Sequence, residues 1–130
     1  MKQMRHSVQR DAIYNELCRQ NDHPTADELY ARLKTDYPNL SLATVYRNLR
    51  QLSDLGKVNI LYTESADHFD GIVSPHYHFY CRECRRIYDA DIPLIPEIVR
   101  AGERIGFGTI ESYRLVFQGV CEHCMKAKTN

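Results

Sequence analysis

The sequence lacks the features that mark a membrane or secreted protein. No apolar run approaches the ~20 residues of a membrane-spanning helix. The basic first residues are not followed by an apolar stretch, so we expect no signal peptide. Internal repeats and low-complexity segments are also missing. A chain of 130 residues with this composition predicts a cytoplasmic globular protein with one ordinary domain or two small ones.

The sequence also lacks an excess of charge of either sign. The 17 Lys and Arg residues balance the 17 Asp and Glu residues, so net charge alone does not indicate a nucleic-acid partner. Residues 1–62 carry nine basic and seven acidic side chains, whereas residues 63–130 carry eight and ten. This bias is too small to identify a partner by itself.

Four of the five cysteines occur in two C-x2-C pairs, Cys81 with Cys84 and Cys121 with Cys124, separated by 36 residues. Each C-x2-C turn presents two sulfurs to one ion, and two such turns complete the tetrahedral thiolate shell of a structural Zn²⁺ site. The alternatives are two disulfides or four unrelated thiols. Cys18 stands alone and is predicted to be a small buried residue of the first helix.

The first half of the chain has the pattern of three helices followed by a hairpin. Thr25 with Glu28 has the form of a capping box, Ser41 is a second N-cap, and Gly56 suits a helix end. The predicted helices are 7–20, from Thr25 to the break at 37–39, and 41–55, and the predicted strands are 58–62 and 68–70. This order predicts a winged helix-turn-helix. We expect the inward side chains of the first and third helices to be Val8, Ala12, Ile13, Leu17, Leu42, Val45, Leu49 and Leu52.

The second half is predicted to mix strands and a helix. Segments 77–81, 85–90 and 113–120 are strand-like, and 93–105 has helical periodicity. The whole chain is therefore expected to be α+β. Its predicted parts are a winged-helix domain at 1–70, a hinge at 71–75, and a small α/β domain at 76–130.

A second set of candidate ligands lies around the first cysteine pair. Alternate side chains of a strand share a face, so His76 and His78 point one way and Cys81 the other. Folding the chain back at the cysteine turn is expected to bring Asp89 roughly opposite His76. A pair of histidines at this spacing also occurs on exposed strands without a metal.

The first half offers two more candidates, His23 and Asp70. Together the set would provide imidazoles and carboxylates, which fit Fe²⁺, Mn²⁺ or Zn²⁺ better than copper(I). His68 lies two residues from Asp70 and remains a competing ligand. His23 considered alone is more typical of a surface or capping residue.

The third helix carries polar and basic side chains away from its inward face. Arginine pairs with guanine edges or phosphates, and tyrosine and threonine contact thymine methyl groups or the backbone, so the helix suits docking in a major groove. The alternative is an ordinary solvated helix face. The residues that we expect to contact DNA are Ser41, Thr44, Tyr46, Arg47 and Arg50.

Several motifs together resemble the ferric uptake regulator (Fur) family. They are HPTAD at 23–27, ATVYRNL at 43–49, and HxHxxCxxC at 76–84 with its distant CxxC at 121–124. The resemblance covers nearly the whole chain. It implies an N-terminal DNA-binding domain, a C-terminal dimerisation domain, and a homodimer that binds an AT-rich inverted-repeat operator in double-stranded DNA.

The resemblance also implies ligand sets and a mechanism. The four paired cysteines correspond to the structural zinc site, and the ligands of a regulatory Fe²⁺ or Mn²⁺ site would be His23, Asp70, His76, His78 and Asp89. An aspartate five residues after the second cysteine is typical of the peroxide-sensing (PerR) branch. In that branch Fe²⁺ and hydrogen peroxide oxidise a ligand histidine, here His23 or His76. Asp91 is an alternative to Asp89.

Two other functions compete with a peroxide-sensing repressor. One is a repressor of the same family that responds to the level of iron, manganese or zinc. The other is a zinc hydrolase that uses His76, His78 and Asp70, but the chain has no H-E-x-x-H or equivalent helix motif. We therefore expect a regulator rather than an enzyme.

Overall fold

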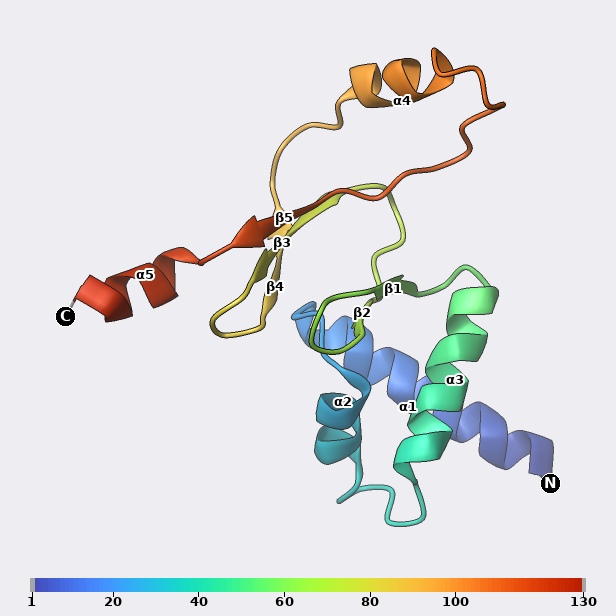
Figure 1. Cartoon of the computed structure of the whole chain (residues 1–130). Coiled ribbons are helices and arrows are strands. Elements are labelled where there is room, and N and C mark those ends of the chain that lie inside the picture. The colour runs from blue at the N-terminus through green and yellow to red at the C-terminus, as the bar shows by residue number, and fades with distance from the viewer. Residues whose placement is uncertain (1, 130) are drawn as a thin grey trace. The chain divides into compact units, whose positions relative to one another are not determined.

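The structure is a computed structural model that describes residues 2–129, with side chains described for residues 8–128. The fold is α+β, as the sequence predicts, and the chain divides into two compact units (Figure 1). The first unit ends at Ser74 and the second begins at Pro75. No helix in the part of the chain that the structure describes is long and apolar enough to cross a membrane.

The first unit consists of helices followed by a hairpin. The helices are α1 (Lys2–Gln20), α2 (Ala26–Leu33) and α3 (Leu42–Asp54), and the hairpin strands are β1 (Asn59–Leu61) and β2 (His68–Asp70). The two strands pair antiparallel, with Ile60 opposite Phe69. The order and type of these elements confirm the winged-helix pattern read from the sequence.

Local hydrogen bonds explain where α2 and α3 begin and end. The Thr25 hydroxyl accepts from the Glu28 backbone N–H, and the Glu28 carboxylate accepts from the Thr25 backbone N–H, which completes the predicted capping box. The Ser41 hydroxyl accepts from the Thr44 N–H at the start of α3. Gly56 follows the end of α3 with a φ of +74°, a conformation that favours glycine.

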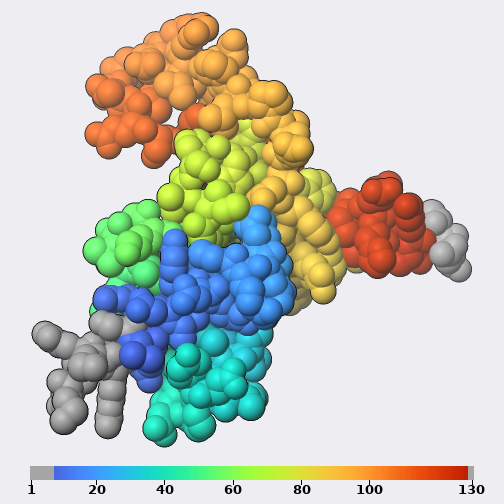
Figure 2. Space-filling view, turned by 180° about the vertical axis from the view of Figure 1, so that it is seen from behind, coloured from blue at the N-terminus to red at the C-terminus, as the bar shows by residue number. Residues whose placement is uncertain are grey.

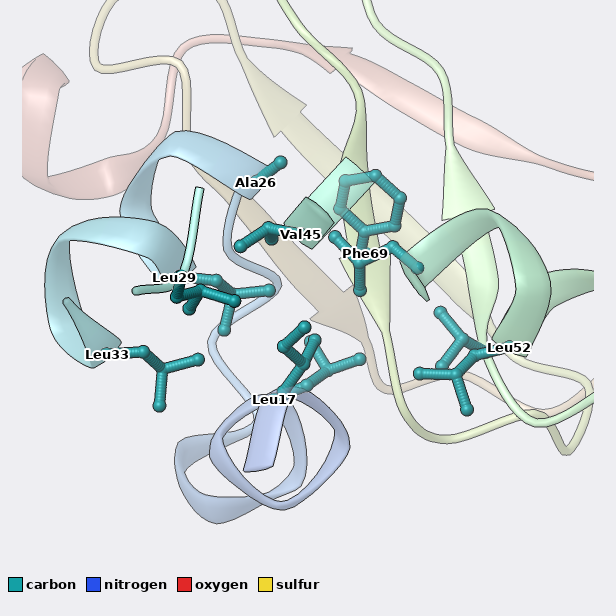
Figure 3. Close-up of a cluster of buried hydrophobic side chains, with 11 residues drawn as sticks. Leu17, Ala26, Leu29, Leu33, Val45, Leu52 and Phe69 are labelled. Carbon is teal, nitrogen blue, oxygen red and sulfur yellow. The ribbon is translucent and has the colours of Figure 1, made fainter. Parts of the chain in front are cut away.

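The core of the first unit is formed where the three helices meet the hairpin (Figure 3). Leu17 of α1, Leu29 of α2, Val45 of α3 and Phe69 of β2 are all buried there. Burying each such side chain stabilises the fold by roughly 1.5–3 kcal/mol. This core fixes the hairpin against the helices, so the end of β2 at Asp70 has a defined place within the unit.

Three expectations about burial in this unit are wrong. Val8 and Leu42 are 54% and 36% exposed. The buried part of α1 begins at Ile13, more than a turn after Val8, and Leu42 is the first residue of α3, at the edge of the core. Cys18 is exposed rather than buried, because Leu17 points into the core and the next residue is turned about 100° around the helix. Helix α1 also begins at Lys2, earlier than expected.

The second unit is built on a mixed three-stranded sheet. Its strands are β3 (Tyr77–Cys81), β4 (Ile87–Ala90) and β5 (Val116–Gly119), in the order β4-β3-β5. Strand β4 is antiparallel to β3, whereas β5 is parallel to it. Two helices, α4 (Pro96–Glu103) and α5 (Glu122–Thr129), lie at opposite ends of this unit in the space-filling view, in orange and red (Figure 2). Helix α4 buries no residue within the described chain.

Strand β3 has the predicted bounds, whereas the other predicted elements of the second unit are shorter than the sequence suggests. Strand β4 begins at Ile87 rather than 85, because Arg85 has a φ of +62° and belongs to the turn. Helix α4 begins at Pro96 rather than 93, since proline suits the first helical position. Strand β5 occupies the middle of the predicted segment 113–120. Helix α5 was not predicted, because the second cysteine pair occupies its start.

Candidate metal centres

The four paired cysteines come together at one end of the second unit. Cys81 ends β3, and Cys84 follows in the turn to β4. Cys121 lies two residues after the end of β5, and Cys124 is in the first turn of α5. Since β3 and β5 are parallel neighbours with Cys81 opposite Gly119, both C-x2-C turns leave the sheet at the same end.

The sulfur positions match a tetrahedral metal site. One donor atom from each cysteine lies within 4.8 Å of all the others. The Cys81–Cys124 and Cys84–Cys121 Sγ–Sγ distances are 3.8 Å and 3.9 Å. A tetrahedron with Zn–S bonds of about 2.3 Å has edges of about 3.8 Å, whereas disulfide sulfurs are about 2.05 Å apart. The four cysteines therefore form a zinc-type site and not the two disulfides that were the alternative.

The pKa values of the thiols in this site differ strongly. Burial raises the pKa of Cys81, but the backbone N–H groups of Cys121 and Cys84 point at its sulfur and lower the pKa to about 6. The pKa of Cys124 rises to about 12, first through its hydrogen bond to Cys121 and then through burial. Four thiolates this close repel one another, and a divalent cation removes that repulsion. The donor set therefore fits Zn²⁺.

Sequence reasoning missed Tyr88, which lies beside this site. Its hydroxyl is 3.9 Å from the sulfurs of both Cys84 and Cys121. Burial raises the pKa of Tyr88 to about 12, with further contributions from the two cysteines, so the group stays a protonated donor. Strand parity could have identified Tyr88. It is adjacent to Asp89 on β4, so the two side chains point to opposite faces of the sheet.

A second group of donors lies on the other face of the same sheet. The Nε2 atoms of His76 and His78 are 3.2 Å and 3.5 Å from one oxygen of Asp89. Their rings are 4.4 Å apart between centroids. The expectation that Asp89 lies opposite His76 is wrong, since Asp89 pairs with His78 in the ladder. Its side chain still reaches both histidines, so two nitrogens and one oxygen converge.

His23 and Asp70 form a buried pair within the first unit. Both are nearly inaccessible to solvent, and His23 Nε2 is 3.4 Å from an Asp70 carboxylate oxygen. The segment before α2 runs antiparallel to β2, since the Phe69 N–H donates to the Pro24 carbonyl at 2.9 Å. The Ile72 N–H donates to the other oxygen of this carboxylate at 2.9 Å, and a metal ion would supply the positive partner that stabilises a buried carboxylate.

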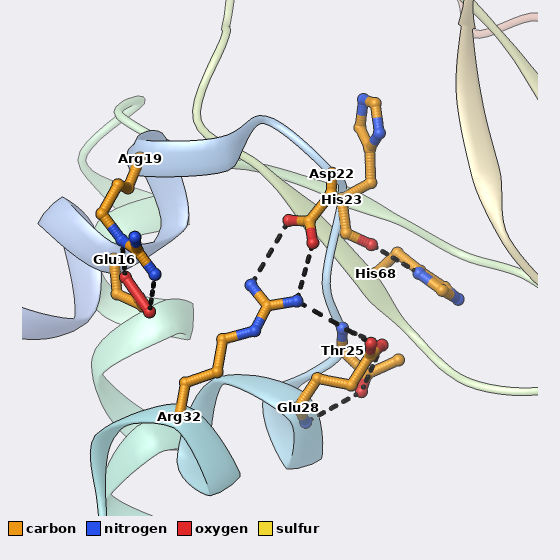
Figure 4. A network of polar contacts seen from close by, with 8 residues as sticks. All are labelled: Glu16, Arg19, Asp22, His23, Thr25, Glu28, Arg32 and His68. Carbon is orange, nitrogen blue, oxygen red and sulfur yellow. Dashed lines mark hydrogen bonds and ion pairs between the residues drawn. The ribbon is translucent and has the colours of Figure 1, made fainter.

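His68 supports this pair from the backbone side. Its Nδ1 atom is 2.7 Å from the His23 carbonyl oxygen, as Figure 4 shows. The buried imidazole therefore holds the backbone that carries His23. The sequence left open whether His68 is a metal ligand. This contact instead indicates that His68 positions His23.

The expected DNA-contacting residues lie on the first turns of α3. The side chains of Ser41, Tyr46, Arg47 and Arg50 are exposed, and Thr44 is half-buried. The Ser41 and Thr44 hydroxyls are 2.8 Å apart. On the inner side of the helix, the buried Asn48 amide donates to the Thr44 carbonyl. Burial, Asp27 and Asp67 together raise the pKa of Tyr46, so its phenol remains a neutral donor.

Comparison with known proteins identifies the family of this chain. The model of the family described as "Ferric uptake regulator family" matches residues 1–117 of this chain. The chain belongs to the ferric uptake regulator family. Members of this family are metal-dependent transcriptional regulators rather than enzymes, and they bind DNA and dimerise.

The Fur-family relatives include proteins that respond to peroxide. The peroxide-responsive repressor PerR of Staphylococcus aureus (strain USA300) is 39% identical over 122 residues, which cover 93% of this chain and 82% of that protein. The Campylobacter jejuni peroxide stress regulator superposes with a TM-score of 0.79 at 28% identity, covering 95% and 93% of the two chains. The Helicobacter pylori ferric uptake regulator Fur has the same fold, with a TM-score of 0.78 at 22% identity, covering 91% and 80%.

Proposed function

We propose that this Fur-family protein represses transcription with a regulatory metal ion bound and releases DNA when hydrogen peroxide oxidises one of its own histidines. Its similarity to a peroxide-responsive repressor supports this assignment. The local observation that carries it is Asp89, whose short side chain brings one oxygen to 3.2 Å and 3.5 Å from two imidazoles.

One regulatory ion would be shared by five ligands. The first unit supplies two donors, from His23 and Asp70, and the second supplies three, from His76, His78 and Asp89. Neither group alone satisfies a cation that prefers six ligands, such as Fe²⁺ or Mn²⁺. The six peptide steps from Asp70 to His76 span at most about 20 Å, which sets an upper limit on the distance that one shared ion would have to bridge.

Sharing the ion would couple metal binding to DNA binding. An ion held by both units favours one orientation of the DNA-binding unit over others, provided that it binds that orientation more tightly. Loss of one histidine ligand removes part of this preference. The protein would then return to orientations that do not hold the operator.

The oxidation would alter a ligand of the ion itself. Bound Fe²⁺ supplies the redox chemistry that lets peroxide transfer one oxygen atom to a nearby imidazole, with water as the other product. His23 and His76 are the proposed targets by resemblance to the peroxide-sensing branch, and each holds a ring nitrogen in the donor group of its unit. Mn²⁺ would support DNA binding and leave the histidines unmodified.

Peptide mass spectrometry of two metal forms tests this proposal. Peroxide should add about 16 Da to His23 or His76 in the Fe²⁺ form and leave the Mn²⁺ form unchanged, with loss of operator binding in the Fe²⁺ form alone. Oxidation confined to cysteines, or equal in both forms, would reject peroxide sensing. A repressor that responds to metal level would then remain.

We further propose that Cys81, Cys84, Cys121 and Cys124 hold a structural Zn²⁺ and that the second unit mediates a homodimer. The edge strand β5 and the segments on either side of α4 support an interface there, because they expose apolar side chains: Val116 and Phe117 in β5, and Leu94, Ile95, Ile105 and Phe107 around α4. The exposed residues of α3, including Arg47 and Arg50, would bind the major groove of an AT-rich inverted repeat, with Ser41, Thr44 and Tyr46 beside them.

A further inference from the structure

The loop before α2 places His23 in an unusual backbone conformation. Asn21 and His23 have φ angles of +49° and +53°, in the left-handed region that side chains other than glycine rarely adopt. A residue with a side chain is strained in this region, so the conformation persists only where surrounding contacts hold it. The contacts that hold this loop therefore decide where the His23 ring points.

Arg32 forms an ion pair with Asp22, the residue between Asn21 and His23. Its guanidinium donates to both carboxylate oxygens of Asp22, at 2.7 Å and 3.3 Å, and lies 4.0 Å from Glu28. Figure 4 shows Asp22 turned toward Arg32 while the His23 ring points away from this network. A two-pronged arginine–carboxylate contact fixes orientation as well as distance. The loop is thereby attached to α2, an element of the packed core.

The other side of His23 is attached to β2. The His23 carbonyl is 2.7 Å from His68 Nδ1, and the Pro24 carbonyl accepts from the Phe69 N–H. His23 thus lies between a side-chain clamp on α2 and a backbone pairing with β2. Both anchors belong to the first unit, so they act before any ion is bound.

We propose that Arg32, acting through Asp22, is a positioning residue that sets His23 in its metal-binding conformation. The proposal rests on the proposed function, in which His23 is a ligand of the regulatory ion. Without the clamp, the loop relaxes toward ordinary backbone angles and the ligand must be ordered when the ion binds. The apparent affinity for metal then falls in proportion to the fraction of molecules in which His23 is already in its metal-binding conformation.

The test measures Mn²⁺ affinity in the full-length, zinc-loaded protein, since Mn²⁺ should not oxidise its ligands. Arg32→Ala should raise the Kd for Mn²⁺ about 10-fold, the low end for losing a partner that orients a metal ligand. Arg32→Lys should recover only part of the affinity, because an ammonium group cannot make the two-pronged contact. Zinc content should not change in either variant.

Arg19→Ala is the matched control. Arg19 makes a similar two-pronged contact with Glu16, at 2.6 Å and 2.9 Å, but both residues belong to α1 and lie outside the His23 loop. This variant removes an equivalent arginine pair from the same unit. It should leave Mn²⁺ affinity unchanged, and thermal unfolding of both variants reports any general loss of stability.

His23→Ala separates the positioning role from the proposed function. If His23→Ala weakens Mn²⁺ binding and Arg32→Ala does not, the positioning role is wrong and the ligand assignment stands. Equal weakening by Arg32→Ala and Arg19→Ala, in step with lost stability, also overturns it. If His23→Ala leaves Mn²⁺ affinity unchanged, His23 is not a ligand, and both claims fail.

Discussion

At the scale of single residues, Asp89 shows what strand parity can and cannot decide. Parity correctly placed His76 and His78 on the face opposite Cys81. It could not give the register, because a shift of two residues along β4 leaves every side chain on the same face. The turn between β3 and β4 sets the register, and Asp89 pairs with His78 as a result. Asp91 therefore lies beyond the paired strand, which favours Asp89 as the ligand.

Lengthening this side chain should disturb the sensor. In Asp89→Glu the carboxylate gains one methylene, so its oxygen no longer fits the 3.2 Å and 3.5 Å contacts with both imidazoles. We expect histidine oxidation by peroxide in the Fe²⁺ form to fall, while metal-dependent DNA binding persists. Mass spectrometry and operator binding of the same sample check both parts. Undiminished histidine oxidation would show that carboxylate length does not set the response.

At the scale of elements, the starts of helices that carry a side-chain cap were predicted well, whereas the starts of helices without one were not. Thr25 and Ser41 have side chains that bond the first free N–H groups, so α2 and α3 begin where these residues stand. Helix α4 has no side-chain cap, and its start depends on Pro96. Helix α5 begins inside a cysteine motif, so metal-ligand spacing obscured its helical pattern.

Helix α3 makes a prediction of its own. Arg47→Ala should weaken operator binding while metal content and dimerisation stay intact. Loss of a base contact should cost roughly 1–3 kcal/mol and relax specificity at one position, whereas loss of a phosphate contact should weaken binding to every sequence and reduce the salt dependence. Titration of operator and scrambled DNA at several salt concentrations distinguishes the two.

Arg86→Ala is a suitable control for that experiment. It removes the same charge from an exposed position of the second unit, near the cysteine turn. Equal weakening by both variants would mean that total charge, and not the face of α3, governs the affinity.

At the scale of the whole molecule, stability is expected to depend on metal. The second unit has a small sheet, and α4 buries no residue within the described chain, so its apolar core is limited. A Zn²⁺ held by four cysteines would join β3, the turn, β5 and α5 at one end. Metal binding of this kind contributes directly to folding.

Cys81→Ser should therefore lose zinc and destabilise the second unit together with the dimer. Cys81 is buried and its sulfur accepts backbone hydrogen bonds from Cys84 and Cys121, and serine cannot replace it as a thiolate ligand. Zinc content, thermal unfolding and sedimentation give the readout. Cys18→Ser is the control, since that cysteine is exposed and lies in the other unit. Full zinc content and stability in Cys81→Ser would contradict the structural role.

Strand β3 carries candidate ligands of both centres only three positions apart, His78 on one face and Cys81 on the other. This spacing restricts how the gene can change. Inserting or deleting one codon between these positions would turn one ligand to the wrong face and destroy a centre. Changes of two codons keep the faces but move one ligand about 7 Å along the strand. Length variation in descendants of this chain should therefore accumulate in the loops on either side of α4, and this short stretch should keep its length.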